Sequence, residues 1–160
     1  MPKIAPCLWF DNQGEEAATF YTSVFPNSRI TEVQRYPETG PGGEGSVSTV
    51  SFSLDGQDYV ALNGGPAFTF SEAISLQVMC ETQDEIDRYW NKLSAGGDDK
   101  AQQCGWLKDR YGLSWQIVPT ALLELTADPD RDRADRTFAA MLQMKKIDIA
   151  QLYRAADRLS

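Results

Sequence analysis

The order of strand and helix signals occurs twice within the first 119 residues, and this repetition restricts the possible folds more than any other feature. A short apolar stretch at 4–10 predicts a strand, and apolar residues at three- and four-residue intervals over 13–25 predict an amphipathic helix. Strands are predicted at 29–36, 47–54 and 57–63, the last two joined by the hairpin signal Asp55-Gly56. The first half is therefore strand, helix, strand, strand, strand.

The second half repeats this order with weaker signals. A strand over 73–80 precedes a helix over 83–95, which the glycines at 96–97 end. A poorly defined strand near 100–103 is followed by strands at 104–108 and 113–118, which the turn 109–112 joins. We predict an α+β fold of two βαβββ modules, about 1–66 and 67–119, related by structural order rather than by residue identity.

After residue 119 the sequence becomes helical in character. Asp128 followed by Pro129 predicts the start of one helix, and Asp148 predicts the start of another. The apolar face of the first of these helices is predicted to contain Phe138, Met141 and Leu142. Residues 120–160 are therefore expected to form a helical extension that packs either on the two modules or on a second subunit.

The charge and the residue usage exclude several classes of function. Lys and Arg number 15 against 23 Asp and Glu, and the resulting net charge of −8 disfavours nucleic acid as a partner. Neither an apolar run of about 20 residues nor a secretion signal is found, so we expect no membrane partner and a cytoplasmic location. Three cysteines fit reduced thiols better than a disulfide framework. The absence of histidine excludes Ser-His-Asp triads, Cys-His pairs and His-containing metal sites.

Strand alternation predicts a polar surface in the second module. Ser75 and Gln77 share one face of the strand 73–80, and the apolar residues between them form the opposite, helix-covered face. In the strand 113–118, Ser114 and Gln116 lie on the face away from the helix. We therefore predict a concave ligand-binding surface that includes Ser75, Gln77 and Gln116.

Four further residues are candidates for this cleft. Asn63 either ends its strand through turn chemistry or offers its amide to a ligand. Cys104 is predicted to share a strand face with Trp106 and Lys108, where it is either a thiol activated by the ammonium or a small buried hydrophobe. Trp106 belongs either to the core or to the edge of the cleft, where its ring contacts a ligand. Leu8 of the first strand completes the predicted lining.

Several segments, weak singly and specific together, resemble the PhnB-like family. They are PCLWFD at 6–11, ATFY at 18–21, LNGGP at 62–66, Trp90 and CGWLKDRYGLSWQ at 104–116. The resemblance covers residues 3 to about 119 and extends into the tail. It implies the curved sheet of the vicinal-oxygen-chelate superfamily, which includes glyoxalase, bleomycin-resistance and dioxygenase proteins. Some PhnB-like proteins carry a demethylubiquinone methyltransferase label.

The resemblance also predicts where a metal would bind. Superfamily enzymes typically hold a divalent metal with His, Gln or Glu from the first, fourth, fifth and eighth strands. The last of these positions falls on Gln116, the first on Ile4 or Pro6, and that of the fifth strand on Ala73 or Ser75. One glutamine without carboxylate or imidazole companions holds a transition metal too weakly, so we predict no metal and no cofactor.

Three functional hypotheses follow. The first is a homodimer whose cleft, at the junction of the modules, binds a small organic molecule without a metal. The second is an enzyme, either a lyase, a dioxygenase or the labelled methyltransferase, that uses Cys104 or an exogenous metal. The third is a structural or interaction module whose cleft is filled by side chains. The glycine-rich stretch 40–45 lies between two predicted strands, so it does not predict a loop for a nucleotide-like methyl donor.

Overall fold

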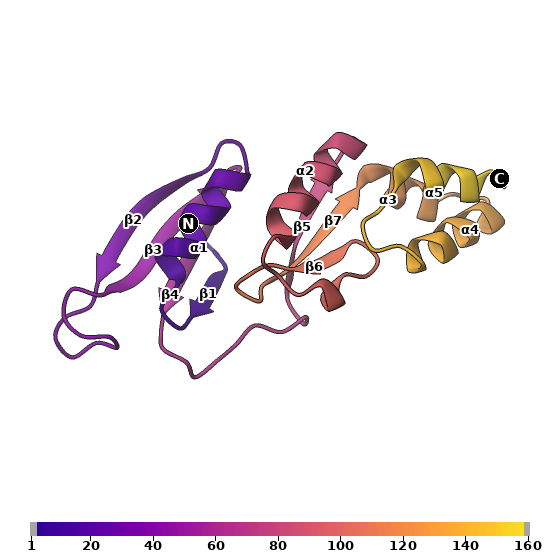
Figure 1. Ribbon diagram of the computed structural model, residues 1–160. Coiled ribbons are helices and arrows are strands. Elements are labelled where there is room, and N and C mark those ends of the chain that lie inside the picture. Colours follow the sequence, from indigo (N-terminus) through magenta and orange to yellow (C-terminus); the bar gives the residue numbers. More distant parts are fainter. Residues whose placement is uncertain (1–2, 159–160) are drawn as a thin grey trace. The chain divides into compact units, whose positions relative to one another are not determined.

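The computed structural model describes residues 3–158. The chain divides into two compact units, Met1–Phe70 and Ser71–Ser160, each with its own sheet and its own helices (Figure 1). The predicted α+β class is confirmed. Within the described residues, no helix is both long enough and apolar enough to span a bilayer.

The first unit has the predicted order of strand, helix and three strands. Its elements are β1 (Cys7–Phe10), α1 (Gly14–Val24), β2 (Arg29–Arg35), β3 (Val47–Leu54) and β4 (Gln57–Asn63). The strands lie in the order β1-β4-β3-β2, with β1 parallel to β4 and the other neighbours antiparallel. The two-residue turn at Asp55 and Gly56 joins β3 to β4 as predicted, and both residues have positive φ.

The core of the first unit lies between α1 and one face of this sheet. Tyr21 of α1 is fully buried, and its ring lies 6.3 Å from that of Phe52 on β3. Leu8 is 5% exposed and pairs in register with Ala61, which pairs in turn with the buried Val50. Leu8 therefore belongs to the helix-covered core, and the prediction that it lines an open cleft is wrong for this unit.

The second unit starts in the predicted way but has a smaller sheet. Its first elements are β5 (Ser75–Cys80), α2 (Gln83–Ser94), the 3-10 helix η1 (Asp99–Ala101), β6 (Trp106–Lys108) and β7 (Ser114–Pro119). The strand order is β5-β7-β6, with β5 parallel and β6 antiparallel to β7. The prediction of a strand near 100–103 is wrong, because Asp98 caps η1 there and Gln103 forms only an isolated bridge to Trp106.

The helix α2 covers one face of the three-stranded sheet (Figure 1). Its buried residues are Ile86, Tyr89, Trp90 and Leu93, and the buried residues of the sheet on this side include Leu107, Trp115 and Ile117. The predicted division of β7 into a helix-covered face and an opposite face is therefore confirmed. The opposite face carries Ser114 and Gln116.

The C-terminal extension packs on the second unit of its own chain. It forms α3 (Thr120–Thr126), α4 (Arg131–Leu142) and α5 (Ile149–Ala156). Val118 of β7 shares a buried apolar cluster with extension residues Leu122, Leu125, Met144, Ile147, Leu152 and Ala156. Packing on a second subunit stays a prediction.

Three details of the extension differ from the sequence-based expectations. The helix α3 was not predicted, and α4 is capped by Asp130 rather than by Asp128. The predicted cap at Asp148 is confirmed, because its carboxylate accepts the backbone N–H of Gln151. Phe138 and Leu142, predicted for the apolar face of α4, are exposed in the single chain and therefore do not pack on its own modules.

Candidate functional site

Two rows of side chains cross the second sheet on the face opposite α2. Strand register places Ser75, Ser114 and Lys108 in one row, and Gln77, Gln116 and Trp106 in the next. We call these six residues the polar face. Four of the predicted cleft residues, Ser75, Gln77, Trp106 and Gln116, are thus brought together.

The amide groups of the polar face form a short hydrogen-bonded chain. Gln116 Nε2 donates to Ser75 Oγ at 2.8 Å, and Gln77 Nε2 donates to Gln116 Oε1 at the long distance of 3.5 Å. Gln77 is exposed and Gln116 is half-buried. Among residues 3–158 the Oε1 atom of Gln77 has no hydrogen-bond partner, so the amide row keeps both donor and acceptor capacity.

The row of Ser75, Ser114 and Lys108 contains a hydroxyl without a hydrogen-bond partner and a cation that is paired. Ser114 is 1% exposed, and its Oγ is buried without a hydrogen-bond partner in the described part of the chain. Buried polar atoms are rarely left in this condition. Lys108 forms an ion pair with Glu72, whose side chain is 62% exposed. The hydrogen bond from Lys108 holds the pKa of Glu72 below the ordinary value for glutamate.

Cys104 does not lie on the polar face. It occupies a turn before β6 with φ +53°, and its N–H donates to the carbonyl of Met144 at 2.8 Å. Its Sγ accepts from Gln103 Nε2 at 3.3 Å. The prediction that Cys104 shares a strand face with Trp106 and Lys108 is therefore wrong, because the C-terminal extension holds it in the turn.

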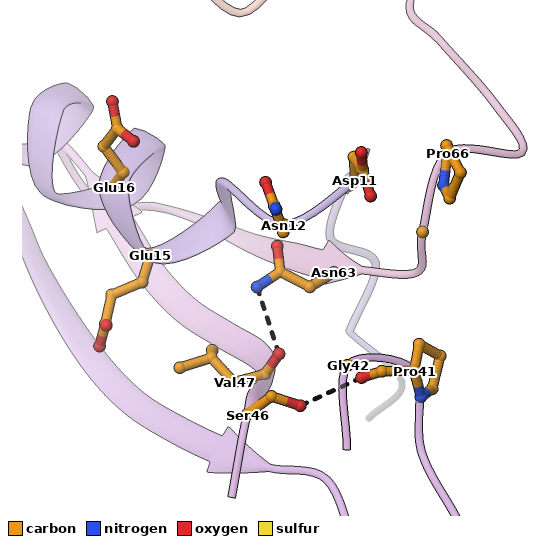
Figure 2. A pocket seen from close by; sticks show the side chains of 11 residues that line it. Asp11, Asn12, Glu15, Glu16, Pro41, Gly42, Ser46, Val47, Asn63 and Pro66 are labelled. Carbon is orange, nitrogen blue, oxygen red and sulfur yellow. Dashed lines mark hydrogen bonds between the residues drawn. The ribbon is translucent and has the colours of Figure 1, made fainter. Parts of the chain in front are cut away.

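A separate pocket of about 510 Å³ lies within the first unit (Figure 2). Figure 2 shows the carboxylates of Asp11, Glu15 and Glu16 at its edge, together with the side chains of Asn12 and Asn63. The other lining residues come from the glycine-rich loop, the start of β3 and the segment that follows β4; they are Pro41, Gly42, Ser46, Val47, Gly65 and Pro66.

Asn63 holds the walls of this pocket together. Its Oδ1 accepts the N–H of Gly14 at 2.7 Å, and its Nδ2 donates to the carbonyl of Val47 at 3.2 Å. Gln13, the N-cap residue of α1, makes no side-chain capping bond, so Asn63 supplies the side-chain acceptor at the start of this helix. The amide is thus engaged by backbone groups of its own unit, and its use by a ligand stays a prediction.

The donor set of the polar face does not fit the metal site that the superfamily implies. The resemblance predicts Gln116 for the last ligand position and Ser75 as one alternative for that of the fifth strand, so the donors available on the polar face are an amide and a hydroxyl. A transition metal prefers imidazole, thiolate or carboxylate ligands. Within residues 3–158, no three His, Cys, Asp or Glu side chains are grouped to hold an ion.

A protein-family model matches residues 2–118, which include both sheets almost completely. The description of that model is 3-demethylubiquinone-9 3-methyltransferase. The chain belongs to this PhnB-like family. The match ends before the C-terminal extension, so the family model does not cover the three helices that pack against Val118. No curated protein sequence matches this PhnB-like chain.

Solved structures agree with the family assignment. The PhnB protein from Bacillus cereus is 40% identical, with a TM-score of 0.66 over 74% of this chain and 99% of that chain. The protein PA1353 from Pseudomonas aeruginosa is 18% identical, with a TM-score of 0.59 over 74% and 98% of the two chains. The fosfomycin resistance protein FosX from Listeria monocytogenes is 12% identical, with a TM-score of 0.51 over 74% and 89%. The last two, at these identities, show a shared fold alone.

Proposed function

We propose that this PhnB-like protein binds a small organic molecule on the polar face and holds it with protein groups alone. The observation that carries the proposal is the row Gln77, Gln116 and Trp106, which sets two amides beside an aromatic ring on a sheet face that α2 does not cover. Small-molecule sites combine apolar walls with a few polar groups that fix orientation. This row has that composition.

The hydrogen bonds of the amide row favour a ligand that both donates and accepts. Gln77 and Gln116 are joined by a 3.5 Å bond, which is weak enough to open when a ligand offers a better partner. Met79, exposed two residues beyond Gln77, adds apolar surface at the same face. A ring with a polar substituent therefore matches the surface better than a wholly apolar or highly charged molecule.

The chemistries of the superfamily receive less support. No pair of strand and helix frames the glycine-rich stretch, which lies between β2 and β3, so it does not form the loop that a nucleotide-like methyl donor requires. The donor set of the polar face does not fit a metal, as described above. Cys104 is held in a turn, and Lys108, the cation expected to activate it, is paired with Glu72.

The proposal includes a homodimer in the cytoplasm, as the sequence predicts. Phe138 and Leu142 are exposed four residues apart on α4, which gives the chain an apolar strip suited to a subunit contact. Light scattering after size-exclusion chromatography measures the mass in solution. A mass of one chain at micromolar concentration contradicts the dimer.

A thermal-shift screen of small metabolites and aromatic antibiotics tests the binding proposal. A ligand present at 100 times its Kd stabilises the native state by about 2.7 kcal/mol. The variant Gln116→Leu is expected to abolish the shift given by a true ligand. Gln57→Leu, which changes an exposed glutamine of the first unit, is expected to retain it. Hits that shift both variants equally contradict the proposed site.

A further inference from the structure

We propose that the polar face selects molecules with a carboxylate, which displaces the carboxylate of Glu72 from Lys108 and, unlike Glu72, also accepts from the hydroxyl of Ser114. This inference rests on the proposed function, because it names the class of molecule that the face binds. The unsatisfied hydroxyl of Ser114 and the internal carboxylate on Lys108 are two independent observations that lead to it.

The row of Ser75, Ser114 and Lys108 has the chemistry of an anion site. Adjacent strands lie about 4.8 Å apart, so the hydroxyl of Ser114 lies between that of Ser75 and the side chain of Lys108. Lys108 is the charged member of the six described residues of the polar face. Its charge is balanced by Glu72 in the free protein, so the face offers a positive charge to a ligand once Glu72 leaves.

Hydroxyl groups in this row have donor capacity that the protein does not use. The Oγ of Ser114 is buried and has no partner among the described residues. The Oγ of Ser75 accepts from Gln116, and no acceptor for its own proton is found in the same range. A carboxylate has about four acceptor sites on its two oxygens, so one anion can accept from Lys108 and from a hydroxyl together.

Glu72 shows that Lys108 accepts a carboxylate. It lies just before β5, and its side chain reaches Lys108 although it is 62% exposed. The lowered pKa of Glu72, caused first by the hydrogen bond from Lys108, shows that the ammonium favours the ionised carboxylate. Exposed ion pairs are weak because water and salt screen them. A ligand carboxylate can therefore displace Glu72, which acts as an internal competitor.

The neighbouring row of Gln77, Gln116 and Trp106 determines which group can be attached to the carboxylate. Residues two apart along a strand are separated by about 7 Å, which is close to the length of a benzene ring with its substituents. A carboxylate on the Lys108 row thus places an attached ring near Trp106 and between the amides. The ligand class is a small aromatic carboxylic acid.

Calorimetric titration with benzoate and benzamide tests this inference. The two probes share the same ring, and the charged carboxylate of benzoate is replaced by a neutral amide in benzamide. Glu72→Gln removes the competitor and is expected to tighten benzoate binding by about three- to fivefold without changing that of benzamide. Glu124→Gln makes the same charge change on the exposed surface of α3 and is expected to leave both affinities unchanged. Lys108→Met is expected to abolish the preference for benzoate.

The outcomes separate this inference from the proposal on which it rests. Equal benzoate affinity in the Glu72→Gln and Glu124→Gln proteins overturns the carboxylate subsite, as does the absence of benzoate binding to Glu72→Gln at millimolar concentration. If Gln116→Leu nevertheless weakens benzamide or a screening hit, binding on the polar face stands and only the preference for acids fails. If Gln116→Leu changes neither, the proposed function fails as well. Thermal unfolding of each variant establishes that it is folded.

Discussion

The indole Nε1 of Trp115 donates a hydrogen bond of 2.9 Å to Oδ2 of Asp109. The other carboxylate oxygen accepts the backbone N–H groups of Tyr111 and Leu113, and Asp109 is 2% exposed. One buried carboxylate therefore ties the turn between β6 and β7 to the helix-covered side of β7. This turn fixes the register between β6 and β7, and that register places the side chains of the polar face on the opposite side of the sheet.

The substitution Asp109→Asn is expected to destabilise the protein by about 2 kcal/mol. Both carboxylate oxygens of Asp109 accept hydrogen bonds, and an asparagine keeps only one acceptor oxygen because its NH2 group cannot accept. Urea unfolding measures the change. Asp135→Asn, on the exposed surface of α4, is the matched control and is expected to stay within about 0.5 kcal/mol of the wild type. An equal effect of the two substitutions contradicts the bracing role of Asp109.

Asn63→Ala is expected to lower the free energy of unfolding by about 1 to 2 kcal/mol. The substitution removes the acceptor for the N–H of Gly14 at the start of α1 and the donor to the carbonyl of Val47. Asn12→Ala alters an exposed amide at the edge of the same pocket and serves as control. Loss of stability in the control alone excludes the capping role of Asn63.

Leu152→Ala tests how the C-terminal extension is held. Leu152 is fully buried in the cluster around Val118, so truncation is expected to destabilise the protein by about 2 to 5 kcal/mol. Leu123→Ala changes an exposed leucine of α3, and an effect within about 0.5 kcal/mol is expected. A stable Leu152→Ala protein contradicts packing of the extension on the second sheet.

Cysteine labelling tests the thiol environments. Burial raises the pKa of Cys80 to about 11, with a further contribution from the charge of Glu85. Because the thiolate is the reactive form, Cys80 is expected to resist iodoacetamide near neutral pH and to react only on unfolding, whereas the exposed Cys7 reacts in the native protein. Rapid labelling of Cys80 in the native protein contradicts this burial. Labelling confined to Cys104 supports the alternative hypothesis of an enzyme that uses Cys104.

Much of the polar face could be predicted from the sequence because side chains alternate along a strand with a period of two. That period placed Ser75, Gln77 and Gln116 on one face before any pairing was known, and the register confirms it. The turn at 55–56 could also be predicted from its own residues, because they tolerate the positive φ that a two-residue hairpin needs.

The remaining site features depend on contacts between distant parts of the sequence. Cys104 adopts a left-handed conformation because it and Gly105 donate to the carbonyls of Met144 and Lys145, about 40 residues later. The cap of α1 comes from Asn63, 49 residues after Gly14. Leu8 belongs to a strand with bulky apolar residues on both faces, so alternation alone could not show which face α1 covers.

Ligand binding on the polar face depends most directly on the side-chain amide of Gln116. Nitrogen-15 NMR spectra, recorded while the best ligand of the thermal-shift screen is added, report on this group and on Gln77. We predict saturable shifts of both amide signals at the concentration that stabilises the protein, and the loss of binding in the Gln116→Leu variant. A ligand that binds with the same affinity to both proteins and leaves the two amide signals unchanged would contradict ligand binding on the polar face.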